Sequence, residues 1–474
     1  MGKQIGNHAV VLGGSMAGLL AARVLSDSYA TVTVVDRDVL TGVTVPRRGV
    51  PHGPHAHGLL ARGHQILEEL YPGITESLTS TGVPIGDLNG EIRWYVDGIR
   101  LAPEESDLIC LSATRPVLEN AVREGTARIP NVHIIERTDI LGLVPSPDRS
   151  SITGVRVQHQ DGAVDAEEIL DAEIVVDCTG RGSRTPAWLD SLGYQRAEEE
   201  KVKVGLAYCT RHYRLRSDPF RGDLAINPIA TPEHPRGAFF SRISDDDPDH
   251  AELSLTGILG DHAPTDPEGF EAFARSLPVP EIWESIKDAE PLTDPVRFSF
   301  PASTRKRYEK LTRFPRNLFL VGDSVCSFNP VYGQGMTMAA LEAMTLREHL
   351  RGGVLPRPLE YLRDISAIID APWQVAAGGD LAFAGVEGRR TLRVRLENAY
   401  TARFLTAAAS DGRLTTLFFR VAGFIEPPTA MVRPSTLLRV FRPRRRPVQE
   451  PFVLAPREAQ RETGTEPTRL DDAA

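Results

Sequence analysis

A short glycine-rich turn near the N-terminus has the spacing of a nucleotide-binding site. The segment Gly13-Gly14-Ser15-Met16-Ala17-Gly18 follows an apolar run over residues 8–12. Gly13 permits a tight turn, Gly18 permits close packing of a helix on the strand, and the helix N-terminus offers free N–H groups to a phosphate. Asp36 lies 23 residues after Gly13, where it can accept hydrogen bonds from an adenosine ribose. The turn predicts a bound dinucleotide, and by itself it does not distinguish NAD from FAD.

This turn departs from the usual pattern at one position. Ser15 stands where a second glycine normally lets the backbone approach a pyrophosphate. Serine is small, and its hydroxyl group can itself bond a phosphate oxygen. We therefore predict that residues 13–18, together with Asp36 and its neighbour Arg37, bind the adenosine half of the dinucleotide.

A second turn lies far along the chain and carries another recognisable motif. The apolar run Asn317-Leu-Phe-Leu-Val-Gly-Asp323 ends in a Gly-Asp pair, and Pro330-Val-Tyr-Gly333-Gln334-Gly335-Met336 leads from it into a helical pattern over residues 337–350. This segment resembles the Gly-Asp motif of the flavoprotein monooxygenases related to 4-hydroxybenzoate hydroxylase. The resemblance implies that Asp323 bonds the ribityl chain of FAD and that the residues from Pro330 to Met336 lie beside its isoalloxazine ring. The N-terminus of the following helix would then stabilise negative charge on the reduced flavin.

Two further segments resemble the same family. Asp177-Cys-Thr-Gly180-Arg-Gly182-Ser-Arg184 is similar to the family's middle Asp-Gly motif, but Cys178 stands where glycine is usual, which puts direct use of NADPH in question. Arg115, at the start of a predicted helix, resembles the family arginine that contacts the flavin or its phosphates. The alternative for Arg115 is an arginine that caps a helix on the surface.

The loop Pro46-Arg47-Arg48-Gly-Val-Pro-His52-Gly-Pro-His55-Ala-His57 has two interpretations. Its histidines could bind a metal, but no carboxylate partner or helical spacing supports this, and we predict no metal site. The loop resembles the one that covers FAD in the family, which implies that Arg47 and His57 contact the cofactor. With the motifs above, it is most similar to the actinobacterial polyether epoxidases and polyketide-tailoring monooxygenases. This resemblance spans roughly residues 8 to 375 and is weakest in the substrate domain.

The resemblance implies an FAD-dependent monooxygenase that uses O2. It would epoxidise or hydroxylate a small organic substrate, polyketide- or terpenoid-like, through a flavin C4a-hydroperoxide. NADPH or NADH would supply electrons directly or through a partner flavin reductase. No catalytic residue is assigned, because Tyr208, His212 and Tyr213 alternate between the two faces of a predicted strand.

Other activities of flavin and nucleotide proteins remain as alternatives. The strongest is an FAD-dependent reductase of C=C bonds in a prenyl-type substrate. A halogenase is disfavoured because the four tryptophans are scattered and no lysine occurs between Lys3 and Lys201. The Gly-Asp motif disfavours an NAD dehydrogenase. A non-catalytic flavin-binding protein would bind FAD without substrate-linked oxygen uptake.

The residues around these motifs predict the elements that position them. Strands are expected at residues 8–12, 31–35, 132–136, 154–159, 173–177 and 317–321, and helices at residues 19–25, 59–70, from about 115, and 337–350. Residues 92–101 resemble a hairpin with Asp97-Gly98 as its turn. Alternation over residues 204–213, 237–243 and 252–258 indicates a largely antiparallel sheet.

The expected fold is α/β, with a Rossmann-like FAD-binding domain of the glutathione-reductase type. An inserted, mostly antiparallel substrate domain and a C-terminal helical region complete it. We predict the FAD-binding domain at residues 1–80, 111–195 and 305–371, the substrate domain at 81–110 and 196–304, the helical region at 372–455, and a disordered tail at 456–474. The arginines between Arg433 and Arg446 could touch a membrane surface or an acidic carrier protein, although a solvated segment is favoured.

Composition limits the class of protein. The 474 residues are 41% hydrophobic and 25% charged, as in globular proteins of two or three units. The net charge of −9 argues against general nucleic-acid binding. The four cysteines form no CxxC pair, which excludes a dithiol centre of that kind. No run is long enough to span a bilayer, and no signal peptide is evident, so we expect a cytoplasmic protein without integral membrane association.

Overall fold

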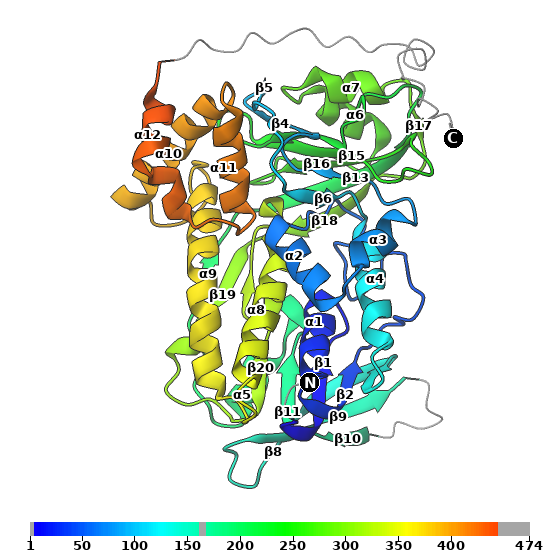
Figure 1. The fold of residues 1–474 in the computed structure, drawn as a ribbon, viewed down its shortest axis with the longest axis vertical. Coiled ribbons are helices and arrows are strands. Elements are labelled where there is room, and N and C mark those ends of the chain that lie inside the picture. Colours follow the sequence, from blue (N-terminus) through cyan, green and yellow to red (C-terminus); the bar gives the residue numbers. More distant parts are fainter. Residues whose placement is uncertain (1–3, 161–166, 444–474) are drawn as a thin grey trace, which may run out of the picture.

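A five-stranded parallel sheet lies at the centre of the larger lobe. The computed structural model describes residues 4–160 and 167–443, and Figure 1 shows the sheet with helices on its faces. Its strand order is β20-β11-β1-β2-β7, comprising β1 (Gly6–Leu12), β2 (Tyr29–Val35), β7 (Val132–Ile135), β11 (Ile174–Asp177) and β20 (Leu318–Leu320). Most of these residues are buried, because helices and the strands at residues 138–145 and 152–159 pack against the sheet.

The helices of this lobe pack closely on the sheet and on one another. They are α1 (Met16–Leu25), α2 (Ala61–Leu70), α3 (Ile74–Thr79), α4 (Arg115–Ala127), α5 (Thr185–Ser191) and α8 (Gln334–Leu350). Helix α1 contacts both α4 and α8. A Cβ atom at Gly18 would lie 1.8 Å from the carbonyl oxygen of Gly13. Only glycine therefore permits α1 to leave the β1 turn at this angle.

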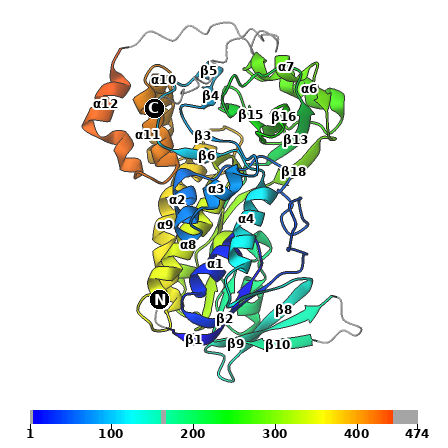
Figure 2. The same ribbon diagram turned by 45° about the vertical axis from the view of Figure 1, so that its right-hand side comes forward.

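A mostly antiparallel sheet of eight strands forms the second lobe, above the first in Figures 1 and 2. The order is β17-β13-β16-β15-β14-β4-β5, with β18 paired to β13, and only the β14–β4 pair is parallel. The strands are β4 (Ile92–Val96), β5 (Ile99–Arg100), β13 (Leu206–Arg214), β14 (Ala225–Ile229), β15 (Arg236–Arg242), β16 (His250–Gly257), β17 (Glu290–Pro291) and β18 (Val296–Phe300).

One face of this sheet packs on two helices, α6 (Pro267–Arg275) and α7 (Pro280–Ile286). The core between them contains the fully buried side chains of Phe240, Leu253 and Phe270. Since side chains alternate along each strand, the opposite face of β13 and β16 is directed away from these helices. That opposite face includes the side chains nearest the large cavity described below.

Three small sheets join the two lobes and flank them. They consist of β8 (Thr138–Pro145), β9 (Ile152–His159) and β10 (Glu167–Asp171); of β12 (Glu199–Val202), β19 (Ser303–Lys306) and β21 (Cys326–Ser327); and of β3 (Ile85–Asp87) with β6 (Ile109–Leu111). The first lies at the lower end of the molecule in Figure 2.

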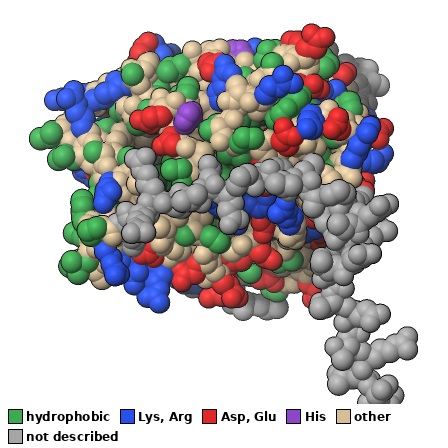
Figure 3. All heavy atoms as spheres, turned by 90° about the horizontal axis from the view of Figure 1, so that it is seen from above, with side chains coloured by type: hydrophobic (Ala, Val, Ile, Leu, Met, Phe, Trp, Pro, Cys, Tyr) green, Lys and Arg blue, Asp and Glu red, His purple; other side chains and the backbone are tan. Residues whose placement is uncertain are grey.

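The C-terminal helices stand beside both lobes. They are α9 (Pro358–Asp380), α10 (Leu392–Ala408), α11 (Gly412–Ala422) and α12 (Pro434–Phe441). Figure 3 shows apolar side chains next to basic ones over this end of the molecule, where Leu392, Leu396, Leu438 and Phe441 are exposed. The predicted tail and the last arginines of the basic run lie outside the described residues. Among those described, no helix is long and apolar enough to cross a membrane.

The α/β fold with a second, mostly antiparallel sheet and a helical C-terminal region is confirmed. The hairpin is also present, with left-handed φ angles of 50° at Asp97 and 74° at Gly98. Helix α8 begins three residues earlier than predicted, because Gly333 at φ 65° ends the preceding turn and caps the helix. Strands β8 and β10 were not predicted. The domain boundaries remain predictions, and α9 and β19 run across two of them.

Removing a core side chain of the second lobe tests its packing. Phe270 has no exposed surface. We expect Phe270→Ala to lower the free energy of unfolding of that lobe by about 3–5 kcal/mol, because it leaves a cavity. Urea denaturation followed by fluorescence measures this. Phe441→Ala is the control, since Phe441 is 60% exposed, and it should change the value by less than about 0.5 kcal/mol. Equal effects would contradict this packing.

Candidate cofactor and substrate site

One cavity of about 800 Å³ runs between the turns at the strand ends of the parallel sheet and aromatic side chains of the antiparallel sheet. All predicted binding residues line it except Gly14, Gly18 and Gln334. The two distant motifs therefore meet in space, with Ser15 and Asp36 in one part of the cavity wall and Asp323 and Gly335 in another. Such a volume and such convergent polar groups are typical of small-molecule sites.

Asp36 fixes the shape of the first turn. Its Oδ2 atom accepts a 2.6 Å hydrogen bond from the backbone N–H of Gly14, and its Oδ1 atom accepts one of 2.9 Å from Asp38. The carboxylate thus holds the β1–α1 turn against the end of β2. Gly14 does not line the cavity, and its N–H group holds the turn through Asp36. Gly18 does not line the cavity either, and it allows α1 to pack close to the turn. Arg37 lies at the same part of the cavity wall, with its side chain more than half exposed.

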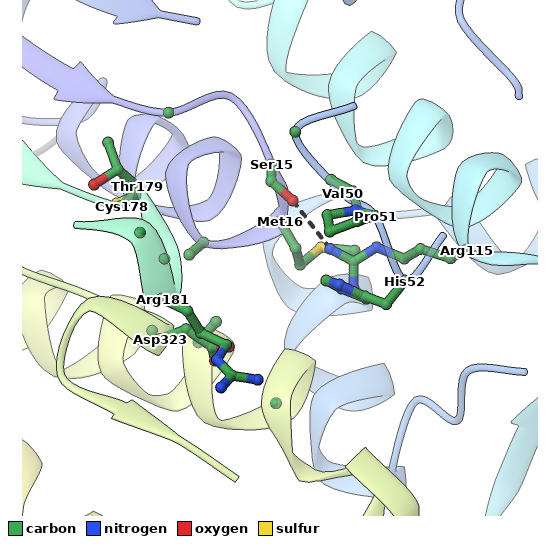
Figure 4. A pocket seen from close by; sticks show the side chains of 18 of the residues that line it. Ser15, Met16, Val50, Pro51, His52, Arg115, Cys178, Thr179, Arg181 and Asp323 are labelled. Carbon is green, nitrogen blue, oxygen red and sulfur yellow. Dashed lines mark hydrogen bonds between the residues drawn. The ribbon is translucent and has the colours of Figure 1, made fainter. Parts of the chain in front are cut away.

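Glu119, which we did not predict as a site residue, is a buried carboxylate that binds side chains from three segments of the cavity wall. Glu119 accepts hydrogen bonds from Arg47 at 2.9 Å, from Arg115 at 3.0 Å and from Arg123 at 3.0 Å. The Ser15 hydroxyl donates to the same carboxylate at 2.8 Å. Figure 4 shows Arg115 extending from α4 to Ser15, which accepts a further 3.1 Å bond from it. Glu119 therefore holds together the first turn, the histidine loop and α4.

The protonation of Glu119 follows from these contacts. Burial by itself would raise its pKa, but Arg115 and Arg47 outweigh burial and bring the pKa down to about 2. Arg115 is itself buried, so the alternative of a surface capping arginine is wrong. The spacing of Arg115, Glu119 and Arg123 at intervals of four on one helix was the available signal, since such residues share a helix face.

The histidine loop forms another wall of the cavity. His52, His55 and His57 all line it. Burial lowers the pKa of His52 to about 3 and that of His55 to about 4, and Arg115 adds to the effect at His52. Burial also lowers the pKa of His57, whose Nδ1 lies 2.7 Å from the carbonyl oxygen of His55. The three rings are therefore neutral near pH 7.

The second motif closes the cavity from the side of α8. Asp323 lies in the short turn that follows β20, and its carboxylate accepts a 3.1 Å hydrogen bond from Ser327. Burial raises the pKa of Asp323. Figure 4 shows Arg181 beside it. Gly335 and Met336, at the N-terminus of α8, line the cavity, and the buried Oε1 of Gln334 has no protein partner. A helix of 17 residues thus directs its positive end at this space.

Two neighbouring residues of the motif at 177–184 have different roles, since Asp177 stabilises the local turn and Cys178 lines the cavity. Asp177 is fully buried, and its carboxylate accepts hydrogen bonds from Thr179, Ser183 and Thr185. It organises the turn after β11 and does not line the cavity. Cys178 does line it and is a free thiol, and burial raises its pKa.

The part of the cavity under the antiparallel sheet is aromatic. Tyr208, Phe298 and Phe300 line it, and the ring centroids of His55 and Tyr208 are 5.8 Å apart. Of the strand residues considered from sequence, only Tyr208 reaches the cavity, while Tyr213 lies in the core on the other face. Within the described residues, no group of three or more His, Cys, Asp and Glu side chains is arranged to hold a metal ion.

Residues 7–352 match the family described as the FAD binding domain, and the chain belongs to this family. It is 32% identical over 442 residues to Protein Rv3254 of Mycobacterium tuberculosis (strain ATCC 25618 / H37Rv), which covers 88% of this chain and 90% of that protein.

Solved structures share the fold. The flavin-dependent brominase Bmp2 is 14% identical, with a TM-score of 0.63 over 88% of this chain and 93% of that one. The p-nitrophenol 4-monooxygenase PnpA from Pseudomonas putida DLL-E4 is 14% identical, with a TM-score of 0.62 over 88% of this chain and 98% of that one.

The residues present fit FAD. A Cβ atom built at Gly335 meets no other atom within 4 Å, so the N-terminus of α8 faces open space in the cavity. The guanidinium groups of Arg47 and Arg115 line the part nearest the first turn, where a pyrophosphate could be neutralised.

Loss of the Glu119 charge should weaken both folding and cofactor binding. We expect Glu119→Gln to lower the free energy of unfolding by about 3–5 kcal/mol, because buried arginines lose their partner. The pKa of Glu119 lies below its ordinary value of 4.5, so this stabilisation is present above about pH 4.5 and is lost as pH falls towards about 2. Denaturation at several pH values measures it, and the difference from the unmutated protein should shrink in acid.

Glu124→Gln provides the matched control on the same helix. The Glu124 carboxylate accepts hydrogen bonds from Asn120 at 2.9 Å and from Arg128 at 3.4 Å. The side chains of Glu124 and Arg128 are both more than half exposed. This variant should change the stability by less than about 1 kcal/mol. An equal loss in both variants would mean that Glu119 has no special role.

Filling the open space at Gly335 tests the location of the cofactor. We expect Gly335→Leu to fold normally but to bind FAD at least about tenfold more weakly, which corresponds to ~1.4 kcal/mol. Titration of the FAD-free protein with FAD gives the affinity, and circular dichroism reports the fold. Gly378→Leu is the control, since Gly378 also has open space at its Cβ position but lies in α9, away from the cavity. Unchanged FAD affinity in Gly335→Leu would rule out this location.

Proposed function

We propose that this chain is an FAD-dependent monooxygenase that transfers one oxygen atom of O2 to a small organic substrate by epoxidation or hydroxylation. The observation that carries the proposal is one cavity lined by the nucleotide turn, by the N-terminus of α8 and by the aromatic chamber, which is the part lined by Tyr208, Phe298 and Phe300. FAD, when bound, would supply electrons and activate O2. The mainly apolar lining of the chamber suits a polyketide- or terpenoid-like molecule.

The protein residues would divide the work of binding. Asp36 and the first turn hold the adenosine half, while Arg47 and Arg115, fixed by Glu119, neutralise the pyrophosphate. Asp323 would hold the ribityl chain. The N–H groups at the start of α8 would stabilise negative charge on the ring. Phe298, Phe300 and the neutral histidines would exclude water from the reacting atoms.

The electron donor is part of the proposal. NADPH or NADH would reduce the flavin directly or through a partner flavin reductase. The middle motif bears on this choice, because Asp177 is fully occupied by its own turn and Cys178 replaces the usual glycine. These two features favour delivery by a partner reductase.

Oxygen transfer is tested with FAD-loaded protein, NADPH, a flavin reductase, 18O-labelled O2 and a panel of polyketide and terpenoid alkenes and phenols. We expect a product that has gained one labelled oxygen atom, detected by mass spectrometry. Omitting the reductase shows whether NADPH alone suffices. A gain of two hydrogens without oxygen would identify a C=C reductase, and oxygen uptake without any product from the panel would count against the proposed substrates.

A further inference from the structure

The C-terminal helices carry a concentration of positive charge that the rest of the chain lacks. Residues 389–443 contain ten arginines, no lysine and three acidic residues, whereas the whole chain has a net charge of −9. Each of the three acidic side chains is already paired with an arginine: Glu397 with Arg393 at 2.7 Å, Asp411 with Arg439 at 3.1 Å and Glu426 with Arg433 at 2.9 Å. The acids of this region therefore leave other arginines uncompensated.

Three arginines of these helices have no partner among the described residues. Within residues 4–160 and 167–443, no side-chain hydrogen bond or ion pair involves Arg395, Arg403 or Arg442. All three side chains are exposed. A guanidinium group presents several N–H donors in a planar fork that matches phosphate and carboxylate oxygens. The charge at this end of the molecule therefore favours an anionic partner.

The same helices expose large apolar side chains beside these arginines. Leu392 and Leu396 of α10 are 73% and 62% exposed, and Leu438 and Phe441 of α12 are 76% and 60% exposed. Positions 392, 396 and 403 share one face of α10, since four and seven residues correspond to about one and two helical turns. Apolar groups gathered on an exposed helix face mark an interaction surface.

These exposed faces belong to a packed unit. Phe404 of α10, Leu414 of α11 and Val440 of α12 are buried in one small core. The outward faces of α10 and α12 cannot turn inwards without opening that core. Figure 1 places these helices at the outer side of the molecule, and Figure 3 shows apolar and basic side chains next to one another at the corresponding end.

We propose that the exposed faces of α10 and α12 bind the surface of a membrane that contains anionic phospholipids. The unpaired arginines bind lipid phosphates, and the four exposed apolar side chains enter the boundary between head groups and acyl chains. This surface is separate from the cavity, and its role does not depend on the proposed function.

Other occupants fit these faces less well. A second copy of the chain in a two-fold contact would place the same unpaired arginines against one another. A nucleic acid would compensate the arginines but would leave four large apolar side chains without a partner. An acidic protein would also compensate the arginines, but it would give this chain no affinity for vesicles made only of lipid.

Co-sedimentation with vesicles tests the proposal. Full-length protein loaded with FAD is mixed with vesicles of phosphatidylcholine alone or of phosphatidylcholine with phosphatidylglycerol. We expect the anionic vesicles to be bound at least about tenfold more tightly than the neutral ones, because the arginines are attracted to the negative surface. Added salt should weaken the binding, since it screens exposed charges.

Paired substitutions on α10 test the two kinds of side chain separately. Arg395→Gln combined with Arg403→Gln removes two unpaired charges, and Leu392→Ser combined with Leu396→Ser removes two exposed apolar side chains. Each pair should weaken binding to the anionic vesicles at least about tenfold. All four positions are exposed, so bound FAD and the circular dichroism spectrum should remain unchanged.

Matched pairs elsewhere in the chain serve as controls. Arg128→Gln combined with Arg196→Gln removes the same number of charges, from side chains that are 77% and 72% exposed. Val354→Ser combined with Leu355→Ser removes apolar side chains that are 66% and 40% exposed, between α8 and α9. Both control pairs should bind the anionic vesicles as tightly as the unmutated protein.

Several results would overturn the proposal. These are no binding to the anionic vesicles, equal binding to both kinds of vesicle, or the same loss of binding in the α10 pairs and in the control pairs. Self-association without lipid that the α10 substitutions abolish would assign this face to a second copy of the chain, and it would also overturn the proposal.

Discussion

The arrangement of the nucleotide end depends on one buried negative charge. A carboxylate without partners in the interior would be too costly to keep ionised, so its surroundings must supply positive charge and donors. Glu119 receives them from three arginines and a serine. Arg47 also bonds Asp38 at 3.0 Å. If one arginine moved away, the buried carboxylate would lose part of its compensating positive charge, which is costly in a low-dielectric interior. The arginines are therefore held in place before any ligand binds.

The second constraint is the difference between the two faces of the antiparallel sheet. Alternation along β13 places Tyr213 in an apolar core with α6 and places Tyr208 on the cavity. The same alternation along β16 separates buried Leu253 from buried Glu252. One face of the sheet packs in an apolar core with α6 and α7, and the other face presents side chains to the cavity. The buried polar side chains of Thr210, Ser254 and Glu252 consequently share one face of the sheet with the aromatic side chains of Tyr208, Phe298 and Phe300.

The two lobes present different chemical groups to the cavity. The parallel sheet contributes strand ends, glycine turns and helix N-termini, which bind anionic groups. The antiparallel sheet contributes aromatic rings. The loop over residues 46–57 contributes histidines, of which His52 is kept neutral by burial and by Arg115. The cavity between them is charged where a pyrophosphate would lie and apolar where the substrate would react. This change from charged to apolar lining along the cavity suits both the FAD expected from the family and the proposed oxygen transfer.

Local sequence was sufficient for the turns that bind nucleotides. Gly13 and Gly18 satisfy backbone requirements that no other residue meets, and Asp36 follows its strand directly, so their roles can be read from spacing. Whether Arg115 was buried or on the surface, and which of Tyr208, His212 and Tyr213 faced the cavity, depended on contacts between segments distant in the chain. The role of Glu119, and the hydrogen bonds that join His55, Thr210 and Ser254, became evident only in three dimensions. The reason is that the cost of burying a charge or a polar group depends on which partners the fold brings to it.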